Sequence, residues 1–349
     1  MMSHLKAGRK PSRLLGLAAG VLGFALILTG CSSGGGSPSA SGGSKNYKIT
    51  FLPKSLGNNY FQASDGDGGK SAVTAFGGTY QEVGPTAATA SAQVSYINTL
   101  TQQHVGAIVL SANDPSALCT SLKQAMTAGV KVVTFDSDVN PDCRNVFVNQ
   151  ASTQGIAQAQ ADNIAKEIGG KGDIAILSAT ANATNQNAWN KAMIAYIGTK
   201  YPDLKVVTTV YGNDDDQTSY DDTAALVQKY PNLKGIVSPT TVGIAAAARY
   251  LSTSQYKGKI ALTGLGTPNA MRAYIKDGTV GSFALWNPSD LGYLAAYTAK
   301  ALIDGTITGK DGDSFKAGKL GEYKVGPDGT VLLGKPTTFD KSNIGKFNF

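Results

Sequence analysis

The sequence predicts an α/β protein whose main part is two lobes, each a doubly wound parallel sheet with covering helices, joined by a three-segment hinge. From residue 47 onward, short β-branched or apolar runs alternate with longer segments of helical period, as in parallel sheets joined by helices. Ten such runs exceed one comfortable small sheet, and a polar turn at 149–151 divides them. About 300 residues follow the N-terminal leader, which is enough chain for two separate cores.

We expect strands at 47–52, 79–82, 107–110, 130–135, 146–148, 173–177, 205–210, 235–237, 259–263 and 281–285. We expect helices at 89–103, 115–127, 155–168, 186–199, 220–229, 244–251, 268–277 and 291–302, several of them after Asn, Asp, Ser or Thr, which can cap free amides. The predicted N-terminal lobe comprises 46–149 plus 287–312. The predicted C-terminal lobe comprises 150–286 plus 313–349, with hinge crossings near Asn149, Asn287 and residue 313.

The first 30 residues are typical of a lipoprotein signal peptide. Basic residues precede an uncharged apolar segment at 14–28. As a helix this segment would be about 22 Å long, too short for a hydrocarbon layer of about 30 Å. The ending Leu28-Thr29-Gly30-Cys31 resembles a lipobox, which predicts lipidation of Cys31, and 31–45 reads as a flexible Gly/Ser tether. We therefore expect a domain at the extracytoplasmic face of the cell membrane, attached by lipid only.

Charge and histidine content exclude several classes of function. The leader holds four of the 31 basic residues and none of the 24 acidic ones, so the rest of the chain has 27 basic residues and a net charge of +3. Without a long Lys/Arg run, a nucleic-acid partner is not expected. One of the two histidines is in the leader and the other, His104, is at a predicted helix end. No metal site of the Cys/His kind, no cofactor and no histidine-based nucleophilic catalysis are therefore expected.

Three cysteines are present, and assigning Cys31 to lipid leaves Cys119 and Cys143. An oxidising extracytoplasmic setting favours a disulfide between them. Cys119 opens a predicted helix and Cys143 follows the neighbouring strand, so their adjacency is plausible. Two buried thiols are the alternative.

Motifs of catalysis or phosphate binding fail on inspection. Segment 65–71 has Ser64 where a phosphate loop needs its first glycine, and the glutamate of an EF-hand is absent. Gly264-Leu265-Gly266 has Asn269 where a dinucleotide fingerprint needs a third glycine. Segment 213–216 is interpreted as a solvated loop that caps the next helix. We expect a non-enzyme; a glycosidase, the alternative, would need two carboxylates across the ligand, and Asp136 with Asp290 is the pair available.

The loops after the predicted strands carry amides, hydroxyls, a few carboxylates and aromatic faces. In open parallel sheets the ligand sits beyond the carboxyl ends of the strands, so these loops should line a cleft between the lobes. The inventory suits a neutral sugar, whose hydroxyls both donate and accept while its C–H faces pack on rings. We expect Lys54 and Asp136 to bind ring hydroxyls, with Asn59 nearby. Asn185, Gln186 and Asn287 should bind from the second lobe and hinge, and Phe61 and Trp286 should pack on the apolar face. Turn formation and helix capping are the alternative roles for about half of the Asn and Asp residues.

At these loops, over residues 46–349, the chain resembles the sugar-binding lipoproteins of ABC importers, which have the type I periplasmic-binding-protein fold. The segments that carry the resemblance are Phe51-Leu52-Pro53-Lys54, 134–138 (TFDSD), 183–189 (ATNQNAW), 239–247 (PTTVGIAAA) and 285–292 (LWNPSDLG). They are most similar to rhamnose-binding proteins, with autoinducer-2-binding proteins as a sister branch. The sister branch implies that Lys54, Asp136, Gln186 and Pro239 hold the ligand. It has aspartate and alanine where this chain has Asn185 and Thr241, and both differences agree with the rhamnose-like pattern.

The resemblance implies a monomeric binding protein that captures L-rhamnose or a related deoxy sugar and delivers it to an ABC permease with its ATPase. Autoinducer-2, or a pentose or tetritol, is the alternative ligand. A sensory module that presents bound sugar to a membrane receptor is the alternative role.

Overall fold

The computed structural model describes residues 45–349. The predicted signal peptide (1–30), the lipidated Cys31 and nearly all of the predicted tether (31–45) lie outside the described residues. The described residues form one compact unit. Within the described range, the helices are all too short or too polar to cross a membrane.

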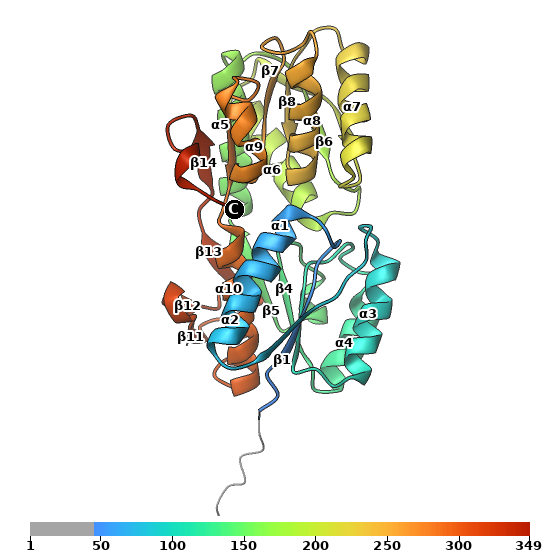
Figure 1. The fold of residues 1–349 in the computed structure, drawn as a ribbon, viewed down its shortest axis with the longest axis vertical. Coiled ribbons are helices and arrows are strands. Elements are labelled where there is room, and N and C mark those ends of the chain that lie inside the picture. The colour runs from blue at the N-terminus through green and yellow to red at the C-terminus, as the bar shows by residue number, and fades with distance from the viewer. Residues whose placement is uncertain (1–44) are drawn as a thin grey trace, which may run out of the picture. The chain divides into compact units, whose positions relative to one another are not determined.

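A six-stranded parallel sheet forms the core of the first lobe, in the lower part of Figure 1. Its strand order is β13-β5-β4-β3-β1-β2. Its inner strands are apolar and buried on both faces, because helices cover the sheet on both sides. The strands are β1 (Lys48–Leu52), β2 (Thr79–Glu82), β3 (Ala107–Leu110), β4 (Lys131–Phe135), β5 (Val146–Ala151) and β13 (Thr330–Gly334).

A four-stranded parallel sheet, in the order β7-β6-β8-β9, forms the core of the second lobe. Next to it an antiparallel pair, β10 with β14, is joined to the sheet's edge by a bridge between Leu265 and Ala284. The strands are β6 (Gly172–Ser178), β7 (Leu204–Tyr211), β8 (Leu233–Ser238), β9 (Ala261–Gly264), β10 (Ser282–Leu285) and β14 (Thr337–Asp340). The prediction of two parallel-sheet lobes is confirmed.

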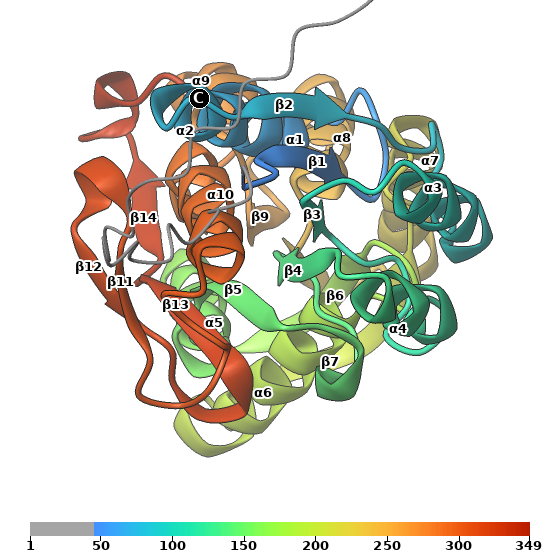
Figure 2. The same ribbon diagram turned by 90° about the horizontal axis from the view of Figure 1, so that it is seen from below.

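Helices cover both faces of each sheet, as the view from below in Figure 2 shows for the first lobe. The first lobe has α1 (Asn59–Phe61), a π-helix (Gln62–Gly69), α2 (Lys70–Ala75), α3 (Ala90–Gln102), α4 (Cys119–Thr127) and α10 (Pro288–Asp304). The second has α5 (Thr153–Ile168), α6 (Thr184–Lys200), α7 (Asp216–Lys229), α8 (Thr241–Thr253) and α9 (Pro268–Lys276). A hairpin of β11 (Ser314–Lys316) and β12 (Glu322–Lys324) and four 3₁₀ turns complete the fold: Pro141–Cys143, Gly318–Leu320, Pro327–Gly329 and Ile344–Lys346.

The π-helix and α10 pack closely because each has glycine at the contact. A Cβ on Gly68 would lie within 3 Å of the Ser289 backbone, and a Cβ on Gly292 would meet the Ser64 backbone in the same way. Neither glycine has room for a side chain. This contact holds the chain between β1 and β2 against α10, next to the ends of strands β1 and β4.

The C-terminal segment differs from the prediction. We expected all of 313–349 in the second lobe, but β13 pairs in parallel with β5 at the edge of the first sheet, so that assignment is wrong for this strand. The chain returns to the second lobe only at 335–336, before β14 pairs with β10. The expected crossing near residue 313 is therefore also misplaced, because β11 packs on α10. The other lobe boundaries stay predictions.

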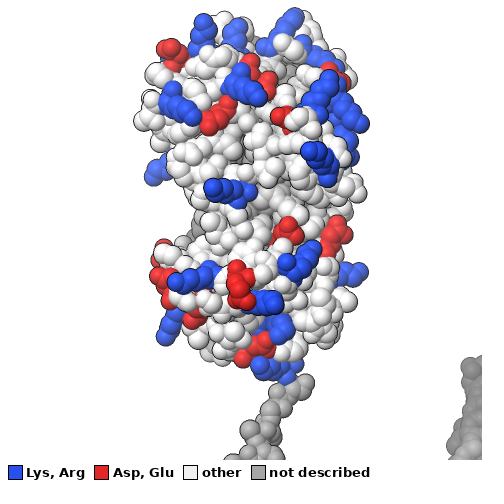
Figure 3. All heavy atoms as spheres, turned by 90° about the vertical axis from the view of Figure 1, so that its left-hand side faces the viewer, with Lys and Arg blue, Asp and Glu red and all other residues white. Residues whose placement is uncertain are grey.

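The surface carries charges of both signs. On the face drawn in Figure 3, basic and acidic side chains are intermixed over both lobes, and neither sign dominates. This distribution agrees with the small net charge of the chain after its leader.

Candidate ligand-binding site

A cavity lies between the carboxyl ends of the two sheets. Loops that follow strands of both sheets supply its walls, as the doubly wound topology requires. The lining residues are Lys54, Asn58, Tyr60, Phe61, Asp136, Asn185, Gln186, Trp189, Asp214, Pro239, Thr240, Thr241, Leu265, Leu285 and Trp286.

Lys54 brings a positive charge into the cavity from the loop after β1. It is only 5% exposed. Its Nζ lies 3.6 Å from Asp136 Oδ2 and donates a hydrogen bond to Asn185 Oδ1 at 3.4 Å. A buried ammonium needs such partners, because burial without them is costly. Lys54 thus connects the first lobe to the first turn of α6 in the second.

Asp136 follows β4 and has a left-handed backbone conformation, with φ of 58°. Only a few per cent of residues other than glycine adopt this region, and such residues cluster at functional sites. Ser111 Oγ donates to Asp136 Oδ2 at 2.7 Å, and Asn185 Nδ2 donates to Oδ1 at 3.1 Å. Gln150 Nε2 donates to the backbone carbonyl at 3.2 Å. The carboxylate is therefore fixed in place by protein donors.

The side-chain amide of Asn185 both accepts and donates a hydrogen bond across the cavity. Its Oδ1 accepts from Lys54, and its Nδ2 donates to Asp136. In the structure, Asn185 Nδ2 donates to an Asp136 oxygen at 3.1 Å. An aspartate at position 185 would place a second carboxylate oxygen there, and two carboxylate oxygens cannot hydrogen-bond to each other. The donor half of Asn185 is therefore what allows this cross-lobe contact.

Gln186 also lies in the first turn of α6, with its orientation set by the end of β6. Its Oε1 accepts from Ser178 Oγ and from the Ala179 amide, both at 2.8 Å. Its Nε2 has no hydrogen-bond acceptor among residues 45–349. Since Gln186 lines the cavity, Nε2 is a donor available to a ligand.

Aromatic rings also line the cavity. Tyr60 and Trp286 meet edge to face with ring centroids 6.1 Å apart, and Trp189 meets Trp286 at 5.8 Å. Trp286 Nε1 donates to Tyr60 Oη at 2.9 Å, which satisfies both polar tips inside an apolar wall. Burial raises the pKa of Tyr60 well above its usual value, and the neighbouring Asp136 carboxylate adds to the shift. Tyr60 therefore keeps its proton at neutral pH.

The second lobe contributes the loop between β8 and α8. Pro239 and Thr240 precede α8, and Thr241 is its first residue; all three line the cavity. Asp214, from the loop after β7, lies beside them and accepts a hydrogen bond from Thr240 Oγ1. Burial raises the pKa of Asp214, while Lys54 and Thr240 partly oppose the shift.

The structure brings together eight of the predicted ligand-binding residues around this cavity: Lys54, Phe61, Asp136, Asn185, Gln186, Pro239, Thr241 and Trp286. Their role in binding stays a prediction. Asn59 and Asn287 are not among the lining residues. Asn59 is exposed, and the Asn287 side chain caps α10 by accepting from the Ser289 amide at 3.0 Å. Asp290, the nominated second carboxylate of a glycosidase, also lies outside the lining.

Sequence reasoning assigned no ligand-binding role to Tyr60, Trp189 or Asp214, all of which line the cavity. Asp214 belongs to the segment interpreted as a solvated capping loop. That interpretation holds for Asp215, whose side chain accepts from the Thr218 amide at 2.8 Å and caps α7. It is wrong for Asp214, which lines the cavity. The available signal was that Asp214 lies in the loop after the predicted strand 205–210.

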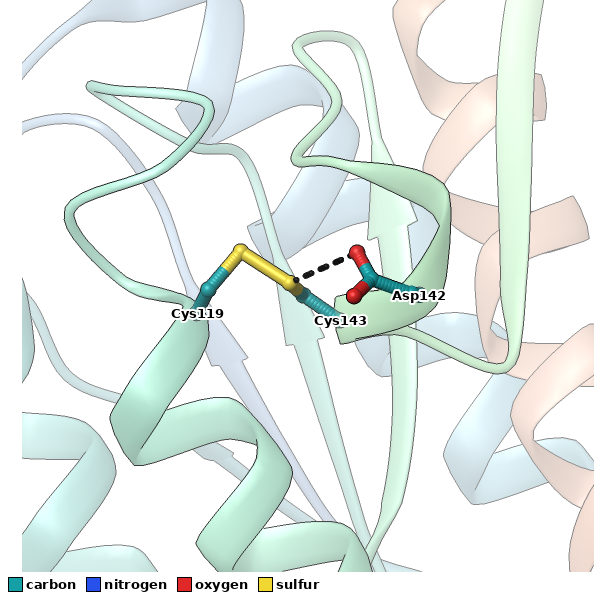
Figure 4. A group of neighbouring side chains, drawn as sticks. All are labelled: Cys119, Asp142 and Cys143. Atoms are coloured by element: carbon teal, nitrogen blue, oxygen red, sulfur yellow. Dashed lines mark hydrogen bonds between the residues drawn. A yellow bond between two sulfur atoms is a disulfide. The ribbon is translucent and has the colours of Figure 1, made fainter.

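Cys119 and Cys143 form a disulfide, with an S–S distance of 2.06 Å. The prediction of this bond is confirmed. It joins the start of α4 to the loop that runs from Asp136 to the start of β5 (Figure 4). Among residues 45–349, Asp142 with these two cysteines is the one cluster of three groups that could ligate a metal, but both sulfurs belong to the disulfide.

Comparison with known proteins gives a family and close structural neighbours. The model of the family described as "Periplasmic binding protein domain" matches residues 49–307. A sugar ABC transporter structure from Actinomyces odontolyticus is 51% identical, with a TM-score of 0.70, and the match covers 86% of this chain and 97% of that one.

Two further neighbours were solved with ligands. An ABC transporter solute-binding protein from Clostridium phytofermentas with bound L-rhamnose is 41% identical, with a TM-score of 0.83, over 86% of this chain and 98% of that one. LsrB from Clostridium saccharobutylicum in complex with AI-2 is 26% identical, with a TM-score of 0.82, over 86% and 99%. The chain is thus similar over the whole described region to proteins that hold small ligands.

Proposed function

The chain belongs to the periplasmic binding protein family, as a sugar-binding protein of ABC-importer type and not an enzyme, and from this premise we propose that it captures L-rhamnose or a closely related deoxy sugar for import. The observation that carries the proposal is the composition of the cavity lining. Hydrogen-bonding groups from both lobes and several aromatic rings line the same space.

The polar side suits the hydroxyls of an uncharged sugar. Lys54 and the Nε2 of Gln186 are donors, carboxylates are acceptors, and Thr241 adds a hydroxyl that can do both. One lysine faces two carboxylates, Asp136 and Asp214, so an anionic sugar would add a further negative charge to a negative lining. A neutral sugar avoids that cost.

The aromatic side suits the methyl group that distinguishes a 6-deoxy sugar. Phe61, Trp189, Trp286 and Leu285 offer apolar surface in the same cavity. A sugar with a hydroxymethyl group at this place would bury a hydroxyl without a partner, which costs about 1–3 kcal/mol. L-rhamnose is also the ligand of the 41% identical neighbour. Both points support a deoxy sugar.

Capture follows from the division of the site between two lobes. A sugar that contacts Asp136 in the first lobe and Gln186 in the second stabilises the closed arrangement relative to an open one. The permease would then receive the sugar from the closed form. We further propose that a lipid on Cys31 and the Gly/Ser tether keep this monomeric protein near its permease at the extracytoplasmic face of the membrane.

Intrinsic fluorescence offers a direct test, because the chain has two tryptophans and both line the cavity. Residues 45–349, unfolded and refolded to remove bound ligand, are titrated with L-rhamnose and followed by emission and calorimetry. We expect a change in emission and micromolar or tighter binding. As a matched variant, Asn185→Asp should bind more weakly, because it places a second carboxylate next to Asp136.

A panel of other ligands separates the alternatives. Binding of AI-2, a pentose or a tetritol without binding of L-rhamnose would overturn the specificity and keep the class. AI-2 is included in the panel because LsrB, which was solved in complex with AI-2, shares the fold at a TM-score of 0.82. No binding across the panel would overturn the proposed function.

A further inference from the structure

The loop between β7 and α7 has an unusual backbone that divides the roles of two successive aspartates. Asn213 and Asp214 both have left-handed conformations, with φ of 55° and 52°. Gly212 before them approaches Ser219 so closely that a Cβ would overlap that side chain. Amides of Gly212 and Asn213 donate to the carbonyls of Ser178 and Ala179, which holds the turn against the end of β6. The strained turn places Asp214 in the cavity while Asp215 caps α7.

The Asp214 carboxylate has one oxygen engaged and one open. Thr240 Oγ1 donates to Oδ1. In the described part of the chain, no donor reaches Oδ2. The residue is partly buried and lines the cavity, so this oxygen is available to a ligand there. The upward shift of the Asp214 pKa, caused first by burial, is consistent with this environment.

Asp136, the other carboxylate of the cavity, is in the opposite situation. Ser111 donates to one of its oxygens and Asn185 to the other, and Lys54 lies within ion-pair distance. The acceptor capacity that remains open to a ligand is therefore greater at Asp214. The two carboxylates come from different lobes, so a ligand between them can be held from both sides.

We propose that Asp214 is a further ligand-binding residue that determines specificity, with Oδ2 accepting a hydrogen bond from one sugar hydroxyl on the side of the second lobe. The inference rests on the proposed function, since it assigns a sugar hydroxyl to this carboxylate. The inference also accounts for the strained turn: the left-handed backbone at Asp214 directs its side chain into the cavity, which an extended backbone at this position would not do.

The test compares Asp214→Asn with a matched control in residues 45–349. Asparagine tolerates the left-handed conformation, so Asp214→Asn removes the charge and preserves the turn. Asp216→Asn is the control, because Asp216 is exposed and pairs with Arg249 outside the cavity. By calorimetry with L-rhamnose, Asp214→Asn should weaken binding about tenfold and Asp214→Ala at least as much, whereas Asp216→Asn should stay within about twofold of the wild type.

Monodeoxy analogues separate a direct contact from a structural role. For the wild type, one of 2-deoxy-, 3-deoxy- and 4-deoxy-L-rhamnose should lose affinity through the missing contact to Asp214. For Asp214→Ala, the same analogue should bind as well as L-rhamnose, because the contact is already gone. Equal loss of affinity for every analogue in the wild type and the variant would assign Asp214 a structural role and overturn the inference.

Different results would refute the proposed function and the role of Asp214. If the wild type binds no L-rhamnose but binds another sugar of the panel, the same variants are titrated with that sugar. Unchanged affinity of Asp214→Asn and Asp214→Ala for a sugar that the wild type binds would refute the role of Asp214 and leave the proposed function standing.

Discussion

Reducing the Cys119–Cys143 disulfide should lower the free energy of unfolding by about 3.5 kcal/mol. The bond joins residues 24 positions apart, so it closes a loop of moderate length in the unfolded chain. The chain-entropy relation for a loop of that size gives about 3.5 kcal/mol at 25 °C. For a unit of roughly 300 residues this corresponds to a decrease of about 5 °C in Tm.

The assay is urea unfolding of residues 45–349 with and without a thiol reductant, followed by circular dichroism. This form lacks Cys31, so the disulfide is the target of the reductant. Oxidised and reduced wild type have the same side chains, and their difference isolates the cross-link from packing. The double variant Cys119→Ala/Cys143→Ala is the control, and its unfolding should not respond to the reductant.

Ligand affinity should change little on reduction, within about twofold. The loop after Asp136 has a second restraint in the ion pair of Asp138 with Arg144, whose Nε and Nη2 donate at 2.7 and 2.8 Å. The same unfolding curve with and without reductant would refute the entropic reasoning. A large loss of affinity on reduction would show that the disulfide shapes the cavity directly.

Three further predictions concern stability, each measured by urea unfolding. Gly68→Ala should cost about 1–3 kcal/mol or more, because the new Cβ overlaps the Ser289 backbone. Tyr60→Phe should cost about 1–3 kcal/mol, because Trp286 Nε1 loses its acceptor inside the protein. Asp65→Asn should remove a pH dependence. Burial raises the pKa of Asp65 well above 3.8, so the native state holds this proton more tightly, and wild-type stability should fall as pH rises from about 4 through the raised pKa.

Matched controls make these three predictions specific. Gly66 lies in the same π-helix with open space where a Cβ would be, so Gly66→Ala should leave stability unchanged or raise it by up to about 1 kcal/mol. Tyr211 is 40% exposed, and Tyr211→Phe should be close to neutral. Equal effects of Gly66→Ala and Gly68→Ala, or of the two tyrosine variants, would contradict the packing arguments. A pH dependence that survives Asp65→Asn would assign it to another group.

Periodicity in the sequence was sufficient for strands β1 to β10, but the parallel edge strand β13 was not predicted. The expected strands 79–82 and 107–110 have the observed bounds, and the others differ at their ends by at most three residues. Short buried apolar runs bounded by turn residues are recognised as strands from the sequence. The π-helix at 62–69 was not predicted. Its segment QASDGDGG is rich in glycine and almost without apolar residues, so its helical form depends on α10, which lies more than 200 residues later. Such a dependence has no local signal.

For the cavity, the rule that ligands bind after strand ends located most of the lining. It could not decide between neighbours in one loop, because that depends on backbone angles. Asn59 was expected at the cavity and Tyr60 lines it; Asp214 was expected in solvent and its left-handed φ turns it inward. Asn287 was also expected at the cavity, but its side chain instead accepts hydrogen bonds from the first amides of α10.

The contact between the π-helix and α10 also limits how the sequence can change over evolutionary time. Gly68 and Gly292 set the same distance between the two helices, each against the other's backbone. A first substitution at either position must push the helices apart, and after that the second position has room for a side chain. The cost of each change therefore depends on its order, so the pair is expected to stay fixed together or to be lost together. Because α10 begins two residues after Trp286, a lineage that loses the pair would also move one wall of its cavity and would have to adjust its ligand at the same time.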